Sequence, residues 1–207
     1  IMPKRNILKQ YGEHELYHVY NRGVAKMDIF REREDYEFML GLFDKYLSSE
    51  NMRDSERRVL PAYGEAVELV AFCLMPNHYH LLLYLKQRDG IMAFMRSAMT
   101  SYSMYFNKKY GRVGGLFESR FLASRISSEE YWQHISRYIH LNPIDLGVDY
   151  LNYPYSSIGC YVSNKQLHWL HPERVYEGSA EAYTQFLSEY ESVHDLYKQV
   201  KHELAHE

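Results

Sequence analysis

One stretch decides the expected fold of this chain, VELVAFCLMPNHYHLLLYL at residues 67–85. It holds two apolar runs, Val67 to Leu74 and His78 to Leu85, separated by Met75-Pro76-Asn77. Both runs have the length and the branched or aromatic content of strands, and the residues between them are typical of a turn. The sequence therefore predicts two paired strands around Met75-Pro76-Asn77.

Two histidines open the second of these runs, spaced by a single tyrosine. Successive strand side chains point to opposite faces, so His78 and His80 share one face while Tyr79 points to the other. Their Cα atoms are expected roughly 6.5–7 Å apart, which lets two imidazoles converge on one divalent ion. Two ordinary histidines on a half-exposed strand would give the same triplet.

Working outward, the chain alternates between strand and helix patterns. Aromatic and branched residues at Leu16–Tyr20 predict a first strand, which Asn21-Arg22-Gly23 ends. Helical spacing of apolar residues marks 34–48, and again 91–105. Phe121–Ile126 is a candidate fourth strand. Ser127 and Glu130 fit the capping box of a last helix, which Pro143 should stop near Asn142.

This order, β-α-β-β-α-β-α, is that of the split βαβ or ferredoxin-like fold. We expect an α+β protein whose antiparallel sheet carries helices on one face and leaves the other face open for a site. Residues 153–162 and 180–205 also look helical. The expected organisation is a main domain at 1–150, which would hold the site, and a helical C-terminal extension at 151–207.

Composition narrows the class of protein. With 207 residues, 46% of them hydrophobic, the chain can bury one substantial core. Its two cysteines make no disulfide framework, and Cys73 lies in an apolar run typical of a core. No apolar window is long enough to cross a membrane, and no signal-peptide pattern opens the sequence. We expect a soluble cytoplasmic protein with no membrane partner.

The net charge of −3 hides an uneven distribution of charge. Residues 171–207 hold eight acidic and three basic residues, whereas residues 96–125 hold six basic residues and one acidic. The basic residues, interleaved with aromatic ones, suit a phosphate backbone and stacked bases. These candidate DNA-binding residues are Arg96, Lys108, Lys109, Arg112, Arg120 and Arg125. A solvated helix face, or cations that complement the helix dipole, would explain the same charges.

The last expected helix carries Tyr138 and Asn142, four residues apart and therefore on one face. Asn142 offers an amide oxygen, an acceptable ligand for Mg²⁺ or Mn²⁺ beside two imidazoles. Such an ion would act as a Lewis acid in phosphodiester chemistry, with Tyr138 as the nucleophile. Tyr138 could equally be one more aromatic residue on an interior helix.

Several motifs resemble those of one family when taken together. They are Met75-Pro76-Asn77-His78-Tyr79-His80, Tyr138-Ile139-His140-Leu141-Asn142-Pro143, Gly115–Phe121 between them and Tyr17–Gly23 before them. The set, over roughly residues 15–160, is similar to the single-tyrosine HUH transposases, named for a His, bulky hydrophobic, His motif. Its nearest branch is the REP-associated tyrosine transposases, which act on repetitive extragenic palindromes.

The resemblance implies a DNA transposase with a ferredoxin-like catalytic domain. In such enzymes a tyrosine attacks single-stranded DNA next to a hairpin, forms a 5′-phosphotyrosine intermediate and frees a 3′-hydroxyl that later rejoins strands. Residue by residue, the motifs match Tyr138 to the nucleophile and His78, His80 and Asn142 to ligands of Mg²⁺ or Mn²⁺. Single-stranded DNA with hairpin elements would be the partner, and the protein would act as a monomer or a homodimer.

Two positions depart from the family pattern. Tyr79 stands where an aliphatic residue is usual, and its hydroxyl needs a partner if buried. Asn142 stands where Gln is common, so His140 or His134 are alternative third ligands. Two other functions fit the same residues. One is a replication initiator or relaxase of the wider HUH group, and the other is a catalytically silent DNA- or RNA-binding protein of the same fold.

Overall fold

A computed structural model describes residues 11–48, 61–126, 131–163 and 165–190. Four strands form one antiparallel sheet in the order β2-β3-β1-β4. The strands are β1 (Glu15–Arg22), β2 (Val67–Met75), β3 (His78–Leu85) and β4 (Leu122–Ile126). The helices are α1 (Arg33–Leu47), α2 (Gly90–Lys109), α3 (Trp132–Leu141) and the short α4 (Gly159–Val162).

The chain order β1-α1-β2-β3-α2-β4, with β1 and β3 in the middle of the sheet, is the split βαβ arrangement. The α+β, ferredoxin-like class expected from the sequence is therefore confirmed. The tight turn between Met75 and His78 joins β2 to β3 as predicted. The turn also holds the segment before α1, because the Pro76 carbonyl accepts hydrogen bonds from the backbone N–H groups of Ile29 and Phe30.

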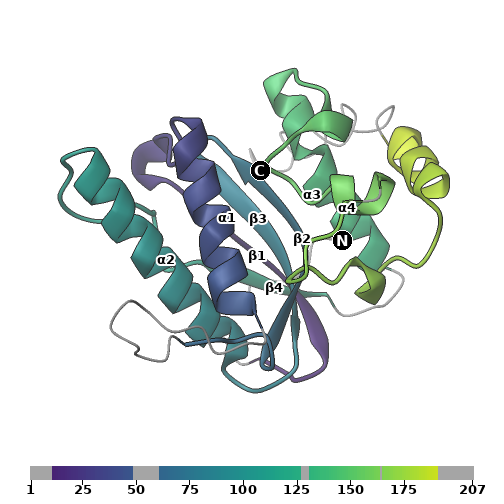
Figure 1. The fold of residues 1–207 in the computed structure, drawn as a ribbon, viewed down its shortest axis with the longest axis horizontal. Coiled ribbons are helices and arrows are strands. Elements are labelled where there is room, and N and C mark those ends of the chain that lie inside the picture. The colour runs from purple at the N-terminus through teal and green to yellow at the C-terminus, as the bar shows by residue number, and fades with distance from the viewer. Residues whose placement is uncertain (1–10, 49–60, 127–130, 164, 191–207) are drawn as a thin grey trace, which may run out of the picture.

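Alternation along the central strands divides the core into two clusters, one on each face of the sheet. Figure 1 shows α1 and α2 together on one side of the sheet, and α3, α4 and residues 180–190 on the other. Strand residues facing α1 and α2 include Tyr17, Val19, Leu81 and Leu83. Those in the opposite cluster include Leu16, Val70, Ala71, Cys73 and Leu82, which pack with Ile139 and Leu141 of α3.

From the sequence we had expected the second face of the sheet to be open. Instead, α3 packs against it. Ile139 and Leu141 are fully buried, and each such side chain stabilises the packing by about 1.5–3 kcal/mol. The α-helix ends at Leu141, and a 3₁₀ turn, Asn142–Leu146, follows with Pro143 in its first positions. This agrees with the predicted stop. The predicted capping box at 127 and 130 lies outside the described residues.

The C-terminal part covers the edge of the sheet at β2. Ser156 forms an antiparallel bridge with Cys73, and Leu170 forms a parallel bridge with Leu69. The backbone N–H of Ser157 donates to the Phe72 carbonyl, and the N–H of Leu74 donates to the Tyr155 carbonyl. These bonds explain why the helix expected over 153–162 is wrong except at Gly159–Val162, because the backbone before α4 pairs with β2 instead.

Of the second helix expected in this region, residues 180–190 are helical and the remainder lies outside the described residues. The side chains of Ile158, Tyr183 and Leu187 join the cluster on the β2 and α3 side. The division into 1–150 and 151–207 stays a prediction, and the structure adds that both parts contribute to one core.

Candidate active site

The two histidines of the H-x-H motif lie at the start of β3, on the face that α3 also packs against. Their ring centroids are 5.0 Å apart and the ring planes are perpendicular. His80 is buried and His78 is half-buried, and Leu82 continues the same face into the core cluster. Strand alternation therefore brings the two imidazoles together as the sequence predicted.

His78 is held by the turn that precedes it. Its Nδ1 is 2.6 Å from Oδ1 of Asn77, whose amide nitrogen donates to the Lys26 carbonyl at 3.3 Å. Because the amide nitrogen faces Lys26, the oxygen faces His78, and the His78 Nδ1–H is the donor. Burial and, to a smaller extent, the Arg22 charge lower the pKa of His78 to about 4, although contact with Asn142 and the Asp145 charge act in the opposite sense. His78 is therefore neutral near pH 7, as a metal ligand must be.

His80 has a histidine partner on the neighbouring strand. Nδ1 of His80 is 2.9 Å from Nε2 of His18 in β1, and the two rings are stacked. The ring of Tyr20 stacks on His18 in turn, with centroids 5.0 Å apart. The sequence placed His18 on a strand without giving it a role, because only the pairing of β1 with β3 brings it to the site.

Tyr138 projects from α3 onto this histidine cluster. Its ring meets His80 edge-on at 5.5 Å and His18 edge-on at 5.7 Å between centroids. Burial first, and then the nearby Asp145 and tyrosines, raise the pKa of Tyr138 to about 12, although the Arg22 charge acts in the opposite sense. The phenol is therefore protonated near neutral pH. The structure thus places the ring of the predicted nucleophile against one predicted ligand, His80.

Asn142 lies at the C-terminal end of α3, one turn after Tyr138. Its amide nitrogen donates to the Tyr138 carbonyl at 2.8 Å, and its side chain contacts His78. Since the nitrogen is committed to the helix backbone, the amide oxygen is the atom that can bind a cation. The helix end thus orients Asn142 toward the histidine pair, in spite of the proline that follows it.

The two alternative third ligands lie elsewhere in the fold. His140 is fully buried, with Nδ1 2.8 Å from the Tyr183 hydroxyl and Nε2 2.7 Å from the Ser157 hydroxyl. His134 bonds through Nδ1 to the guanidinium of Arg137. Within the described part of the chain, no three His, Cys, Asp or Glu side chains are placed to share one ion. This leaves an amide oxygen, that of Asn142, as the third donor beside two imidazoles.

This donor set suits a hard divalent cation. Two neutral imidazoles and one amide oxygen fit Mg²⁺ or Mn²⁺, with remaining positions for water or phosphate oxygens. Each histidine holds its Nδ1 in a hydrogen bond, so each would bind an ion through Nε2. That pattern, with the second ring nitrogen fixed by a neighbour, is usual for histidines that bind metals.

One basic residue near the candidate site, Arg22, is not among the six basic residues chosen from the sequence. Arg22 pairs with His78 in the register of β1 and β3, and its side chain is exposed. Its charge lowers the pKa of both His78 and Tyr138. Strand alternation from His18 could have placed Arg22 on this face, but only the register puts it opposite His78.

The basic residues chosen from the sequence are more scattered. Arg96, Lys108 and Lys109 lie on α2, which covers the face of the sheet opposite to the histidines, and Arg112 follows its end. Arg125 on β4 forms an ion pair with Glu15. The carbonyl of Arg120 accepts a hydrogen bond from Asn21, near the end of the sheet where His78 lies. Their roles in DNA binding stay predictions.

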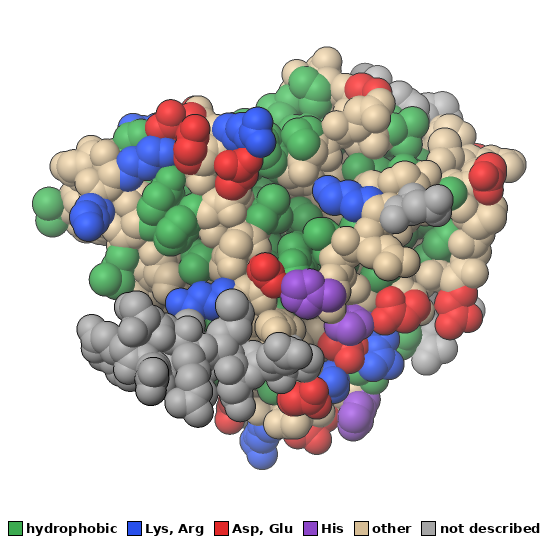
Figure 2. All heavy atoms as spheres, viewed as in Figure 1, with side chains coloured by type: hydrophobic (Ala, Val, Ile, Leu, Met, Phe, Trp, Pro, Cys, Tyr) green, Lys and Arg blue, Asp and Glu red, His purple; other side chains and the backbone are tan. Residues whose placement is uncertain are grey.

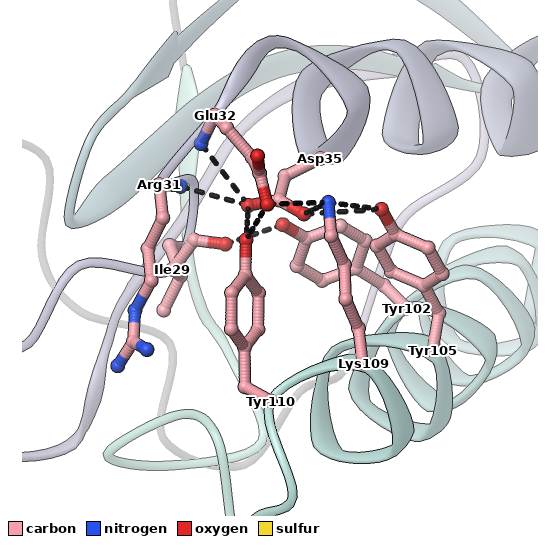
Figure 3. Close-up of polar contacts among 8 residues, drawn as sticks. All are labelled: Ile29, Arg31, Glu32, Asp35, Tyr102, Tyr105, Lys109 and Tyr110. Atoms are coloured by element: carbon pink, nitrogen blue, oxygen red, sulfur yellow. Dashed lines mark hydrogen bonds and ion pairs between the residues drawn. The ribbon is translucent and has the colours of Figure 1, made fainter.

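Lys109 in particular is engaged in ion pairs at the protein surface (Figure 3). Its ammonium is 2.9 Å from the buried carboxylate of Asp35 and 3.0 Å from that of Glu32. The hydroxyls of Tyr105 and Tyr110 also donate to Asp35. The cluster ties the start of α1 to the end of α2. On the face seen in Figure 2, acidic and basic side chains are interspersed over these helices rather than gathered into one basic patch.

Tyr79 points away from the site, into the core beneath α1 and α2. It is fully buried and meets Phe117 edge-on. Burial raises the pKa of Tyr79, and the side chain of Asn21, its cross-strand neighbour, acts in the opposite sense. Among the described residues, the buried Tyr79 hydroxyl has no partner within hydrogen-bond distance and angle. The tyrosine at the central position of the motif is thus accommodated as the bulky residue that fixes the facing of β3.

Known proteins are similar to this chain in sequence over part of its length and in fold. Residues 45–142 match the family model "Transposase IS200 like", a segment that includes His78, His80, Tyr138 and Asn142. Among curated proteins, none is similar enough in sequence to count as a match. No described helix is long and apolar enough to cross a membrane.

Two solved structures resemble the fold. One is a REP-associated tyrosine transposase bound to a REP hairpin, with 17% identity and a TM-score of 0.53, over 83% of this chain and 90% of that chain. The other is a putative transposase from Deinococcus radiodurans, with 17% identity and a TM-score of 0.41, over 63% of this chain and 92% of that chain. At 17% identity, the first likeness establishes a shared fold.

Proposed function

We propose that this chain is an IS200-like transposase and that it cleaves and rejoins single-stranded DNA beside a hairpin through a covalent bond to Tyr138. The observation that carries the proposal is the edge-on contact of the Tyr138 ring with His80, one of two neighbouring histidines whose Nε2 atoms suit a divalent ion. A nucleophile, a ligand set and a cation, Arg22, converge on one end of the sheet.

In the proposed reaction, the Tyr138 oxygen attacks the phosphorus of a DNA phosphodiester. A bond forms between the tyrosine oxygen and phosphorus, the bond from phosphorus to the 3′-oxygen breaks, and a 3′-hydroxyl leaves. The phenolic proton is lost to solvent, and the departing oxygen takes up a proton. Because one phosphodiester replaces another, a 3′-hydroxyl can reverse the attack and rejoin strands without an external energy source.

His78, His80 and Asn142 would hold Mg²⁺ or Mn²⁺, which when bound withdraws charge from the scissile phosphate. The protein's own residues do the remaining work. Asn77 and His18 fix the two imidazoles, α3 holds the Tyr138 ring against His80, and Arg22 would contact a phosphate. The high pKa of Tyr138 keeps its hydroxyl protonated, and therefore weakly nucleophilic, until substrate is present.

The proposed substrate is single-stranded DNA with a hairpin. Support comes from the family and from the fold shared with a transposase that was solved bound to a REP hairpin. Basic residues around the sheet, including Arg120 near the His78 end, would contact phosphates and position the strand.

The first experiment is incubation with labelled single-stranded hairpin DNA and Mn²⁺, followed by a denaturing gel. Wild-type protein should give a label shifted to protein size, and Tyr138→Phe should not, while both bind the hairpin with affinities within a few-fold. Tyr131→Phe is a matched control, because Tyr131 is exposed at the start of the same helix. An adduct that persists in Tyr138→Phe would refute the assignment.

Metal dependence is tested in the same assay. His78→Ala and His80→Ala should lose cleavage but keep salt-sensitive binding, and EDTA should stop cleavage by the wild-type protein. Cleavage that continues in EDTA would defeat the metal site. If no protein forms an adduct and DNA is still bound, the catalytically silent binding protein becomes the better description.

A further inference from the structure

We propose that His18 is a positioning residue that fixes the tautomer of His80 and so presents the Nε2 atom of His80 to the divalent ion. The inference rests on the proposed metal site, and it assigns a role to a residue outside the segment that the family model matches. It concerns the chain's own hydrogen bonding, which can be measured without metal or DNA.

The contact between the two histidines is short, buried and constrained on several sides. Nε2 of His18 lies 2.9 Å from Nδ1 of His80, within the range of a normal hydrogen bond. The exposed fractions are 9% for His18 and 6% for His80, so solvent has little access to compete. The ring planes are 19° apart, and the Tyr20 ring stacks on His18 within 26° of parallel.

A neutral imidazole has one donor nitrogen and one acceptor nitrogen, so the pair shares one proton. If His80 carries it on Nδ1, its Nε2 has a lone pair and can bind a cation. If His18 carries it on Nε2, a neutral His80 must be protonated on Nε2 and cannot bind one. Metal binding therefore requires His18 to be the acceptor, with its own proton on Nδ1.

The other half of the histidine pair shows the same logic. His78 donates from Nδ1 to the Asn77 oxygen, whose identity is fixed by the bond from the Asn77 amide nitrogen to Lys26. Both histidines of the motif thus have Nδ1 held by a neighbour: one by the turn before β3 and one by the adjacent strand β1. Outer partners of this kind orient metal ligands and raise their basicity.

His18 is better placed as an outer partner than as a third ligand. The Nε2 atom of His18 is directed at Nδ1 of His80. With the His18 proton on Nδ1, Nε2 is the atom with which His18 would have to bind an ion, and the hydrogen bond already occupies it. Consistent with this, the described residues contain no trio of His, Cys, Asp or Glu arranged around one ion position. Asn142 then remains the third ligand, and His18 acts through His80.

The experiment combines ¹⁵N NMR of the histidine rings in the metal-free protein with titration of Mn²⁺, followed by EPR of the free ion. The variants are His18→Leu, which removes the acceptor, and His18→Gln, whose amide oxygen can replace it. Ser124→Ala is the matched control, because Ser124 is buried opposite His18 in the β1–β4 register.

In the wild-type protein His80 should carry its proton on Nδ1. His18→Leu should lose this tautomer preference and weaken Mn²⁺ binding by about 10- to 100-fold, the usual effect of losing an outer partner. His18→Gln should recover much of both, and Ser124→Ala should change neither. The Gln variant keeps the test decisive if the Leu variant folds poorly.

Three results would overturn the inference. The first is that His80 of the wild-type protein is protonated on Nε2. The second is that His18→Leu keeps His80 protonated on Nδ1 and binds Mn²⁺ with a dissociation constant within about twofold of wild type. The third is that the pulsed EPR spectrum of Mn²⁺ bound to His18→Gln has lost one directly bound nitrogen. Failure of the proposed reaction would be seen differently, as the absence of a Tyr138 adduct while the His80 tautomer is as expected.

Discussion

Removing the hydroxyl of Tyr183 tests how the C-terminal part of the chain supports the helix that carries Tyr138. This hydroxyl is fully buried and bonds to Nδ1 of His140 at 2.8 Å and to the Ser136 hydroxyl at 2.9 Å. Both partners lie on α3. Ser136 also donates to the Gln133 carbonyl, so in Tyr183→Phe it keeps a bond, whereas Nδ1 of His140 loses the bond that the structure gives it.

The expected loss of stability follows from that single orphaned nitrogen. Leaving a buried polar atom without its partner costs about 1–3 kcal/mol, and the ring itself is preserved, so little cavity forms. We expect the free energy of unfolding to fall by about 2 kcal/mol. For a chain of this length that corresponds to a melting temperature lower by about 4–8 °C.

Urea denaturation of wild type and Tyr183→Phe, fitted with a common slope, measures the change. Tyr176→Phe is the matched control, because its hydroxyl donates to the Ser179 carbonyl in an exposed setting. Its stability should stay within about 0.5 kcal/mol of wild type. Equal stabilities for the two variants would refute the view that this network holds α3 in place.

Three further predictions concern pH, DNA contact and the third ligand. Burial lowers the pKa of His140 from its ordinary value to about 3, so the unfolded chain binds more protons than the folded one between these values. The free energy of unfolding should therefore fall as the pH drops from about 6.5 toward 3. Urea midpoints that stay constant from pH 6.5 to 4 would contradict this. Lys108→Ala should reduce the salt dependence of hairpin binding by about 0.7 in the log–log slope if Lys108 contacts a phosphate, and an unchanged slope would remove it from the interface. Asn142→Ala should weaken Mn²⁺ binding whereas His134→Ala should not, and calorimetric titration giving the reverse order would exchange their roles.

Local pattern was enough for most elements of the fold. Alternation and helical spacing located β2, β3, α1 and α2 to within a few residues, because each of these segments buries one regular face. The segment before α4 was mispredicted because its aromatic residues suit either state. Its backbone bonds to β2, some eighty residues earlier in the chain, decide its conformation.

In the candidate site, too, some residues could be found from local sequence pattern and others only from long-range pairing. His78 and His80 share a face through strand alternation, and Tyr138 and Asn142 share one through helix geometry, so motifs could find all four. The roles of His18 and Arg22 depend on the register of β1 against β3, a long-range feature that no local pattern encodes. The packing of α3 onto the second face of the sheet was missed for the same reason.

The strand-like pairing of residues 155–157 and 170 with β2 has a consequence for how the chain behaves when it is shortened. A chain ending at residue 150 would present a nine-residue, wholly buried strand as a bare outer edge. Its unpaired N–H and C=O groups, with apolar side chains on both faces, would be a template for aggregation. The C-terminal segments thus protect solubility as well as helping to place α3.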